Sequence, residues 1–354
     1  KGNLAMTSTG YNVLGWQEQD ESGNILKKEV QPLRIMTNEN MTYPPEATTQ
    51  AVVSGLCDKN DADINNPDGK QMNLEIFDKQ GYSYTVQMSI HAVNKDEQYY
   101  VQLDDILDST GKSILKDANG TALPNTAVSL GLVGGGAAAQ PNGVTPNATY
   151  GAATLNYVKG SGLFESVGLA AGTAYDPQTG AGKKLGLNFD ATTFPNFQNV
   201  EIDFSSTFNY DKNGVATLAA VSGLEGTGEG SGFRQGGLSG ITVQNNGVIY
   251  GTYDNGQRKV LGQIAVATFA NPSGLSKEGE NLYSSTLNSG EFDGIGVDIS
   301  TTSGKMESGV LEMSNVDLSQ EFTEMITTQR GFQANSRIIT VSDTLLEELT
   351  NLKR

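Results

Sequence analysis

The chain has 354 residues, with 23 Lys and Arg against 40 Asp and Glu, which gives a formal net charge of −17 at pH 7. Domains most often hold roughly 100–150 residues, so this length predicts two or three of them. The negative charge repels phosphate backbones and anionic lipids, no apolar run approaches the roughly 18 residues of a membrane span, and a single cysteine cannot form an internal disulfide framework. Nucleic acid binding, membrane insertion and a multi-cysteine metal site are therefore excluded.

The first block, residues 1–45, predicts short strands. The segments LAMTSTGYNVLGWQ and GNILKKEVQPLRI are interrupted by glycines and a Ser-Gly-Asn turn. The pair Pro44-Pro45 predicts the end of the block, because proline donates no backbone hydrogen bond and restrains the residue before it. The sequence starts without Met, and its first residues lack the basic-then-apolar layout of a signal peptide. We therefore expect an upstream segment that this sequence does not contain.

The clearest strand is YSYTVQMSIHA, residues 82–92, in which apolar and polar side chains alternate. This period of two predicts an antiparallel strand with one face buried. MNLEIF (72–77) precedes it across a turn at 78–81, and QYYVQL (98–103) predicts a third strand. Residues 109–185 are rich in Gly, Ala, Pro and Asn, which predicts loops or an inserted subdomain.

A β-meander is predicted from about residue 186 to 269. The dipeptides Asn246-Gly247 and Asn255-Gly256 mark its hairpin tips, because Asn-Gly reaches the positive φ angles of tight turns at low cost. Residues 270–314 return to Gly- and Ser-rich turns. The predicted fold class is therefore mainly β, a multi-domain chain of antiparallel sandwiches or barrels.

The hydrophobic periodicity changes at about residue 315. Asp317 followed by Gln320 predicts a helix start. Because no proline follows Pro272, one helix of about 36 residues, roughly 54 Å long, is allowed. Apolar residues recur along it at spacings of three and four or their sum: Leu318, Phe322, Met325, Phe332, Ile339 and Leu346. A second apolar stripe near the end consists of Leu345, Leu349 and Leu352. Such a seam needs another helix as a partner, either from the upstream segment or from a neighbouring copy.

Catalytic groups are scarce. The single histidine, His91, falls on the polar face of its strand, so we interpret it as a surface residue. The acidic loop 58–69 resembles the start of a calcium loop, but Asn66 and Met72 stand where Gly and Glu are needed. The Gly-rich segment LVGGGAAAQPNG (132–143) lacks the Lys-Ser/Thr of a phosphate loop. No catalytic residue, metal site or cofactor is predicted.

Three segments resemble a known family. The C-terminal stretch MSNVDLSQEFTEMITTQRGFQANSRIITVSDTLLEELTNLKR (313–354) resembles the terminal segment shared by bacterial flagellar axial proteins, in which NVDL, QR before an aromatic residue, and an NLKR-like end recur. Residues 247–290 resemble the second signature of the rod and hook proteins, and STGYNVLGW (8–16) resembles the first. More than 200 residues separate YPPEATT from VLGQIAVATF, which favours a hook-type member over a distal rod-type member with its shorter middle.

The resemblance implies a division into domains. Residues 1–45 and 262–314 would form a discontinuous middle β domain, and residues 46–261 the outer β domain or domains, with a subdomain inserted at about 109–185. Residues 315–354 would form the C-terminal helix of an inner tube. The N-terminal helix that pairs with it in the family is missing from this sequence.

The resemblance also implies a function without enzymatic activity or cofactor. Copies of the chain would self-assemble into a flexible helical tube, a universal joint that transmits torque from rod to filament and encloses the export channel. Its partners would be other copies, the flagellar rod, the hook cap and hook–filament junction proteins, and the type III export apparatus. Its location would be extracellular, in the flagellum, after export without a cleaved signal peptide. The implied assembly seam is Leu318, Phe322, Met325, Phe332, Ile339, Leu346 and Leu349.

Cys57 leaves two alternatives open, a small buried side chain or an exposed reactive thiol. In some spirochaete members of the family a hook cysteine is joined to a lysine of the neighbouring subunit. Because Cys57 lies near the start of the outer domain, the resemblance offers it as an intersubunit cross-link.

A secreted β-rich adhesin is the alternative from another class, and a hydrolase is the third. The adhesin predicts a ligand pocket and a dispensable C-terminal helix. A tube subunit would instead lose polymerisation when residues 318–354 are deleted.

Overall fold

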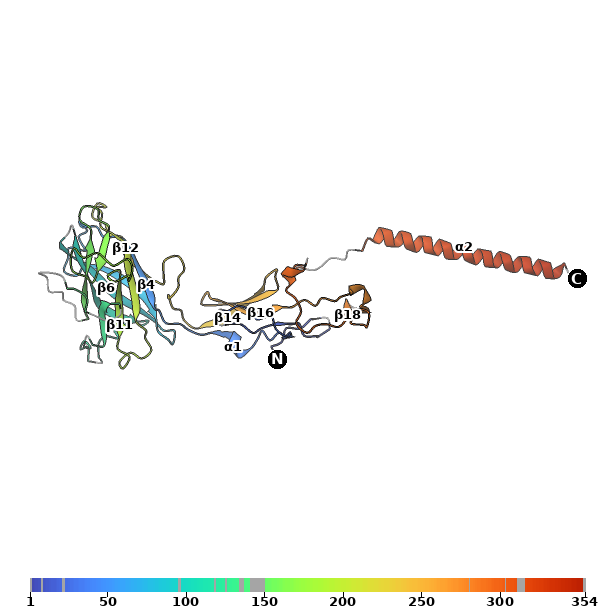
Figure 1. Cartoon of the computed structure of the whole chain (residues 1–354), viewed down its shortest axis with the longest axis horizontal. Helices are drawn as coiled ribbons and strands as arrows, with labels where there is room; N and C mark the ends of the chain where they lie inside the picture. Colours follow the sequence, from blue (N-terminus) through green and yellow to red (C-terminus); the bar gives the residue numbers. More distant parts are fainter. Residues whose placement is uncertain are drawn as a thin grey trace. The chain divides into compact units, whose positions relative to one another are not determined.

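The computed structural model describes residues 2–7, 9–20, 23–94, 97–117, 119–124, 126–133, 137–140, 150–279, 281–302, 304–310 and 316–352. The chain divides into two compact units, Lys1–Met306 and Glu307–Arg354. The first unit is built mainly from strands, and the second contains one long helix, α2 (Leu318–Asn351) (Figure 1). The predicted class, mainly β with a long C-terminal helix, is confirmed.

Two five-stranded sheets form the part of the first unit that we call the outer module, residues 47–232. One sheet is antiparallel in the order β10-β9-β7-β6-β5, with β5 (Lys70–Phe77), β6 (Ser83–Asn94), β7 (Gln98–Asp108), β9 (Ala152–Tyr157) and β10 (Phe164–Val167). The other has the order β13-β4-β12-β11-β8, with β4 (Gln50–Leu56), β8 (Val128–Leu132), β11 (Lys184–Phe189), β12 (Val200–Phe208) and β13 (Ala219–Ser222), and its β4 and β12 run parallel. Apolar side chains from both sheets share one hydrophobic core, so the module is a sandwich.

The strand predicted from alternating residues is confirmed as β6, and the strands predicted before and after it are confirmed as β5 and β7. The turn between β5 and β6 also has the predicted position. The Asp78 carboxylate accepts hydrogen bonds from the N–H groups of Gln80 and Tyr82, both at 2.9 Å, and Gly81 supplies a φ of +84°.

The segment 109–185 differs from its prediction as an inserted subdomain. Strand β8 is an edge of one five-stranded sheet, β9 and β10 extend the other, and all three contribute to the shared core. All six residues of β9 are buried, so the segment lacks the alternation by which a half-exposed strand is recognised. Within the Gly-rich segment, residues 134–136 and 141–143 lie outside the described residues.

A six-stranded sheet forms what we call the middle module, residues 2–46 and 233–306. Its order is β2-β1-β16-β15-β14-β3, with β1 (Leu14–Trp16), β2 (Gln31–Pro32), β3 (Thr42–Tyr43), β14 (Gly236–Val243), β15 (Val248–Tyr253) and β16 (Arg258–Ile264). The predicted Asn-Gly tips join β14 to β15 and β15 to β16, with φ values of +79° at Gly247 and +82° at Gly256. The short elements of this module are α1 (Asn38–Met41), η1 (Pro272–Gly274), β17 (Ser276–Gly279), β18 (Leu282–Ser284) and η2 (Ile299–Thr301).

The sheets also differ from the predicted boundary at residue 262. Strands β14 and β15, which the prediction gave to the outer domain, pair in the same sheet as β1. The chain passes between the two modules twice, at Glu46 and at Phe233. These two residues are joined by backbone hydrogen bonds of 3.1 and 2.9 Å. We propose that the outer domain ends near residue 233, and the division into domains remains a prediction.

Candidate assembly surfaces

Helix α2 begins where the sequence predicts. The Asp317 carboxylate accepts hydrogen bonds from the N–H groups of Ser319 at 2.8 Å and Gln320 at 3.3 Å. The Gln320 side chain donates to Glu324, so Asp317 alone caps the first turn. The 34 residues of α2 span about 51 Å at 1.5 Å per residue. Residues 353 and 354, at the end of the predicted helix, lie outside the described residues.

Every residue of α2 is exposed. Phe332, for example, has 73% of its side chain accessible. The same holds for all seven predicted seam residues, Leu318, Phe322, Met325, Phe332, Ile339, Leu346 and Leu349, and for Ile326, Ile338 and Val341, which the seam prediction left out. Within the described ranges, no helix combines the length and apolar character needed to cross a bilayer.

The seam repeats every seven residues at Met325, Phe332, Ile339 and Leu346. Seven residues are slightly less than two turns of a straight helix, so such a stripe drifts by about 20° per repeat. It stays buried along its length only if α2 winds around a partner helix, or passes from one partner to the next. The geometry therefore suits a helical assembly better than a docking site for one flat surface.

Cys57 is fully buried in the sandwich core. Burial raises the pKa of its thiol to about 12, and the neighbouring Tyr157 hydroxyl only partly offsets this effect. A buried thiol with a raised pKa is a weak nucleophile. The location matches the small buried side chain among the two alternatives, and a cross-link through Cys57 would require local opening of the module.

His91 is not the surface residue that the strand pattern predicted. Only 5% of its area is exposed. Its ring stacks on Tyr100 with centroids 4.7 Å apart, and its Nε2 lies 2.9 Å from the Ser89 hydroxyl. The acidic loop 58–69 covers this face of β6, where Ala92 N–H donates to the Ile64 carbonyl. Burial lowers the pKa of His91, so the ring is neutral at pH 7.

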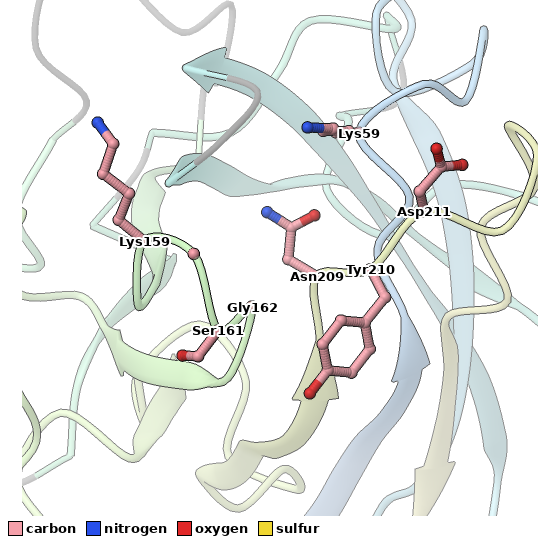
Figure 2. Close-up of a pocket in the computed structure, with 8 residues that line it drawn as sticks. Lys59, Lys159, Ser161, Gly162, Asn209, Tyr210 and Asp211 are labelled. Atoms are coloured by element: carbon pink, nitrogen blue, oxygen red, sulfur yellow. The ribbon is translucent and has the colours of Figure 1, made fainter.

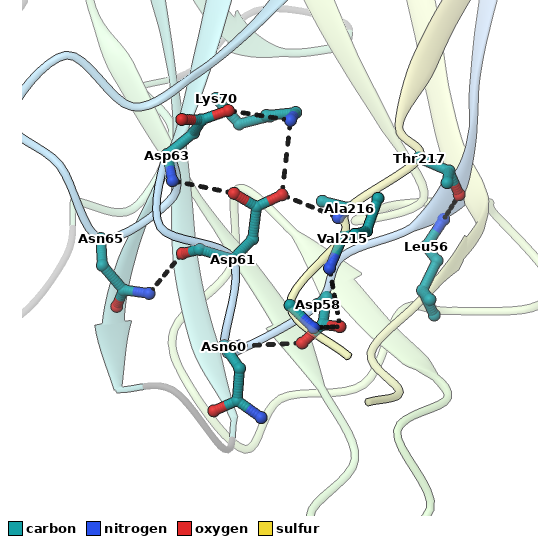
Figure 3. A network of polar contacts seen from close by, with 11 residues as sticks. Leu56, Asp58, Asn60, Asp61, Asp63, Asn65, Lys70, Val215, Ala216 and Thr217 are labelled. Atoms are coloured by element: carbon teal, nitrogen blue, oxygen red, sulfur yellow. Dashed lines mark hydrogen bonds and ion pairs between the residues drawn. The ribbon is translucent and has the colours of Figure 1, made fainter. Parts of the chain in front are cut away.

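The acidic loop carries a network of backbone hydrogen bonds centred on Asp58 (Figure 3). Asp58 Oδ2 accepts hydrogen bonds from the N–H groups of Lys212, Gly214 and Val215 at 2.6–3.2 Å, and Oδ1 accepts from Asn60 at 2.8 Å. Burial raises a carboxyl pKa, but these four donors more than offset it and leave the pKa of Asp58 below its usual value. The buried carboxylate thereby joins two loops about 150 residues apart in sequence.

Asp61 makes a second link between the same loops. Its Oδ2 accepts from the Ala216 N–H at 2.7 Å and lies 3.3 Å from Lys70 Nζ, while Oδ1 accepts from the Asp63 N–H. Both carboxylate oxygens of Asp61 are thus already hydrogen-bonded within the protein. In the described part of the chain, no group of three or more His, Cys, Asp and Glu side chains is placed to hold a metal ion.

A pocket of about 380 Å³ lies on the outer module beside the end of β12. Lys59 and Lys159 flank the Asn209 amide, and Tyr210 and Ser161 complete much of the lining (Figure 2). The Ser161 hydroxyl donates to the Val158 carbonyl, and neither histidine nor cysteine lines the pocket. The lining thus offers polar contacts and holds no activated nucleophile.

The C-terminal part of the chain matches a known protein family. The family described as "Flagellar basal body rod FlgEFG protein C-terminal" matches residues 307–352. This range contains the whole of α2 and every residue of the predicted seam.

Individual flagellar proteins match this chain over about 90–125 residues. The flagellar hook protein of Borreliella burgdorferi is 51% identical over 122 residues, which are 34% of this chain and 27% of that protein. The flagellar basal-body rod protein FlgG of Bacillus subtilis is 58% identical over 93 residues, 26% of this chain and 35% of that protein. The hook protein of Salmonella typhimurium is 42% identical over 123 residues, 35% of this chain and 30% of that protein. The chain thus spans about a third or less of the length of these relatives.

A solved structure, that of the Helicobacter pylori flagellar hook protein FlgE2, aligns with 88% of this chain and 89% of its own, at 14% identity and a TM-score of 0.34. No residue role is transferred on a similarity this low.

Proposed function

Because the chain belongs to the flagellar rod and hook protein family, we propose that it is a structural subunit of the flagellar hook. In this proposal, copies of the chain stack helically into a flexible tube that transmits torque from the rod to the filament and encloses the export channel. The subunit has no enzymatic role and uses no cofactor. It lies outside the cell after export without a cleaved signal peptide, and its neighbours are the rod, the hook cap and the hook–filament junction proteins.

The observation that carries the proposal is the exposure of α2. Burying one large apolar side chain stabilises an assembly by about 1.5–3 kcal/mol, and all seven seam residues are available for such burial. Helices in proteins gain most of their stability from the packing of an apolar face rather than from propensity. A helix of this length and exposure is therefore explained by burial between copies of the chain.

The polar surface of the outer module supports the flexibility of the tube. A tube that bends while it rotates must lengthen and shorten each row of subunits in every turn. Polar, hydrated contacts can slide in this way, whereas a close-packed apolar interface resists sliding. The pocket beside β12 contributes Lys, Ser, Asn and Asp side chains to this surface, next to Tyr210.

Substitutions in α2 test the assembly role directly. Phe332→Asp places a charge within the seam, and we expect it to abolish polymerisation because the carboxylate would be desolvated between helices. Thr327→Asp is the matched control, since it lies on the opposite side of the helix among polar side chains. Electron microscopy and sedimentation of full-length protein measure the outcome. Equal polymer from both variants would contradict the proposal.

The distal rod is the second candidate, favoured by the 58% identity to a basal-body rod protein over 93 residues. Complementation separates the two functions. A hook subunit restores hooks and motility in a strain that lacks its hook gene, whereas a rod subunit restores them only in a strain that lacks its distal rod gene. Rescue of the rod mutant alone would replace the hook assignment with the rod.

A further inference from the structure

A pocket of about 360 Å³ on the middle module brings together two positively charged side chains. Arg34, which follows β2, and Lys259, on β16, both line it. Within the described residues, neither side chain has a carboxylate oxygen within 4 Å, whereas Lys27 of the same module is paired with Asp298 at 2.9 Å. The pocket thus concentrates positive charge on a chain whose net charge is −17.

The backbone carbonyls around this pocket already have hydrogen-bond donors. The Gln17 amide donates to the carbonyls of Arg34 and Leu261 at 3.0 and 3.3 Å, and it accepts from the Arg34 N–H. The Gln19 amide donates to the Val260 carbonyl at 2.7 Å. These three carbonyl oxygens are therefore occupied, while the two cationic side chains still have N–H groups to donate. A carboxylate supplies both the acceptor oxygens and the opposite charge that such donors bind best.

One acidic side chain, Glu39, also lines the pocket. It is exposed, and in the part of the chain that the structure describes it forms no ion pair with Arg34 or Lys259. Lys259 is half-buried, so water and salt screen its charge less than they screen that of a fully exposed side chain. The two cations outnumber Glu39, and the pocket can therefore accept a further carboxylate.

The outer module of another copy can supply that carboxylate. Residues 47–232 contain 20 Asp and Glu against 10 Lys and Arg, so this module carries more than half of the net negative charge of the chain. The middle module, residues 2–46 and 233–306, is less acidic, with 12 against 8. In the proposed polymer α2 is buried against other helices, which leaves the outer module as the main acidic surface. Complementary charges on two surfaces speed their encounter and fix their register.

We propose that the Arg34–Lys259 pocket of one copy binds a carboxylate on the outer module of a neighbouring copy. The inference rests on the proposed function, since it names a contact within the same polymer. The two surfaces come from different modules, so the contact is heterologous. Heterologous contacts that do not close into a ring generate open helical assemblies. This contact repeats from copy to copy independently of the α2 seam.

Zero-length cross-linking tests the contact. A carbodiimide couples a carboxylate to a lysine amine without a spacer, so only groups in contact react. Full-length protein is prepared in isotopically light and heavy forms, which are mixed, polymerised and treated, and the linked peptides are identified by mass spectrometry. We expect Lys259 to be linked to Asp or Glu of residues 47–232, with one light and one heavy partner. Lys305, an exposed lysine of the same module outside the pocket, gives the background.

Charge reversal gives a second measurement. Lys259→Glu should leave the melting temperature of the monomer unchanged and raise the subunit concentration needed for polymerisation at least about ten-fold, because a carboxylate then faces a carboxylate. Arg258→Glu is the matched control, since it changes the net charge equally. Arg258 precedes Lys259 on β16 and does not line the pocket, because neighbouring residues of a strand point to opposite faces. Its reversal should change the concentration by less than about two-fold.

The outcomes separate the contact from the proposed function. Equal effects of the two reversals, or links from Lys259 that stay within one copy or match the Lys305 background, would overturn the contact and leave the proposed function intact. Free glutamate that protects Lys259 of the monomer from acetylation would mark a small-molecule site and would also overturn it. Failure of the unsubstituted protein to polymerise would instead remove the proposed function.

Discussion

Asp58 shows how a single buried carboxylate can organise a surface loop. Its carboxylate accepts hydrogen bonds from four backbone N–H groups in two loops. A buried N–H group without an acceptor would destabilise the fold. The sequence assigned no role to the acidic side chains of this loop, because the match to a calcium loop fails at Asn66 and Met72. Their role in the fold is instead to bond backbone groups contributed by residues 212–216.

We expect Asp58→Asn to lower the free energy of unfolding by about 1.5–3 kcal/mol, because charged acceptors are lost and an amide NH₂ faces backbone donors. Asp63→Asn is the matched control in the same loop. The Asp63 side chain is 59% exposed and its ion pair with Lys70 is expected to contribute less than about 1 kcal/mol. Urea unfolding measures both variants, and similar losses would contradict the role of Asp58.

The pKa of Asp58 also predicts a pH dependence. The folded-state value is lowered relative to about 3.9 in the unfolded chain. The unfolded state therefore binds the proton first as the pH falls, and the stabilisation is complete above about pH 4 and lost as the pH drops through the folded value. The difference in unfolding free energy between the unsubstituted protein and Asp58→Asn should accordingly shrink below pH 4. A constant difference from pH 7 to pH 2 would exclude this linkage.

Burial of Cys57 predicts slow chemistry at its thiol. With a pKa of about 12, the thiolate is scarce at pH 8, and we expect alkylation by iodoacetamide at least 100-fold slower than that of a model thiol. Full reaction should return in concentrated urea. Intact-mass analysis of assembled polymer after boiling in reductant examines the cross-link itself: monomer of unmodified mass alone would remove that hypothesis.

At the scale of elements, the acidic loop and β6 fit closely together. Gly69 lies against the His91 ring with a φ of +64°, and a Cβ at this position would lie 2.6 Å from two ring atoms. The period of two predicts β6 itself from local sequence. The burial of its second face by a loop is a tertiary contact, which no local pattern contains, and for this reason His91 was placed on the surface.

We expect Gly69→Ala to destabilise the protein by about 1–3 kcal/mol more than Gly111→Ala. Both positions have positive φ, +64° and +81°, so both variants share the backbone cost of that conformation. Around Gly111 no atom lies within 4 Å of an added Cβ, so only Gly69→Ala adds a steric clash. Urea unfolding of the two variants measures the difference. Equal destabilisation of the two variants would show that the acidic loop can shift away from His91 without losing stability.

For the whole molecule, the sequence predicts individual elements better than the pairings between them. Strands with alternation, Asn-Gly tips and the capped start of α2 follow from local rules. Pairings such as β4 with β12, about 150 residues apart, depend on contacts that are distant in sequence. The boundary near residue 233 depends on the same kind of contact, since β16 pairs with β1. Of the candidate site, the apolar residues of α2 could be predicted, whereas the contacts of the acidic loop with residues 212–216 could not, because they join loops distant in sequence.

Deletion of residues 307–354 should leave the thermal unfolding of the first unit unchanged to within about 2 °C, because no residue of α2 is buried. Leu74→Ala, which removes buried atoms from the core of the sandwich, is expected to cost about 2–5 kcal/mol and to lower the melting temperature by several degrees. Calorimetry compares the two. A large loss on deletion would mean that the helix supports the first unit.

The pairing of β4 with β12 has a consequence for the timing of folding. Residues 50–56 find their parallel partner only at residues 201–208, and β1 finds β16 only at residues 263–264. Contacts so far apart in sequence form slowly, because a long loop must close first. If the chain leaves a narrow export channel with its N-terminus first, its first strands emerge before their partners. Each module can then complete its sheet only after most of the polypeptide has passed through the channel.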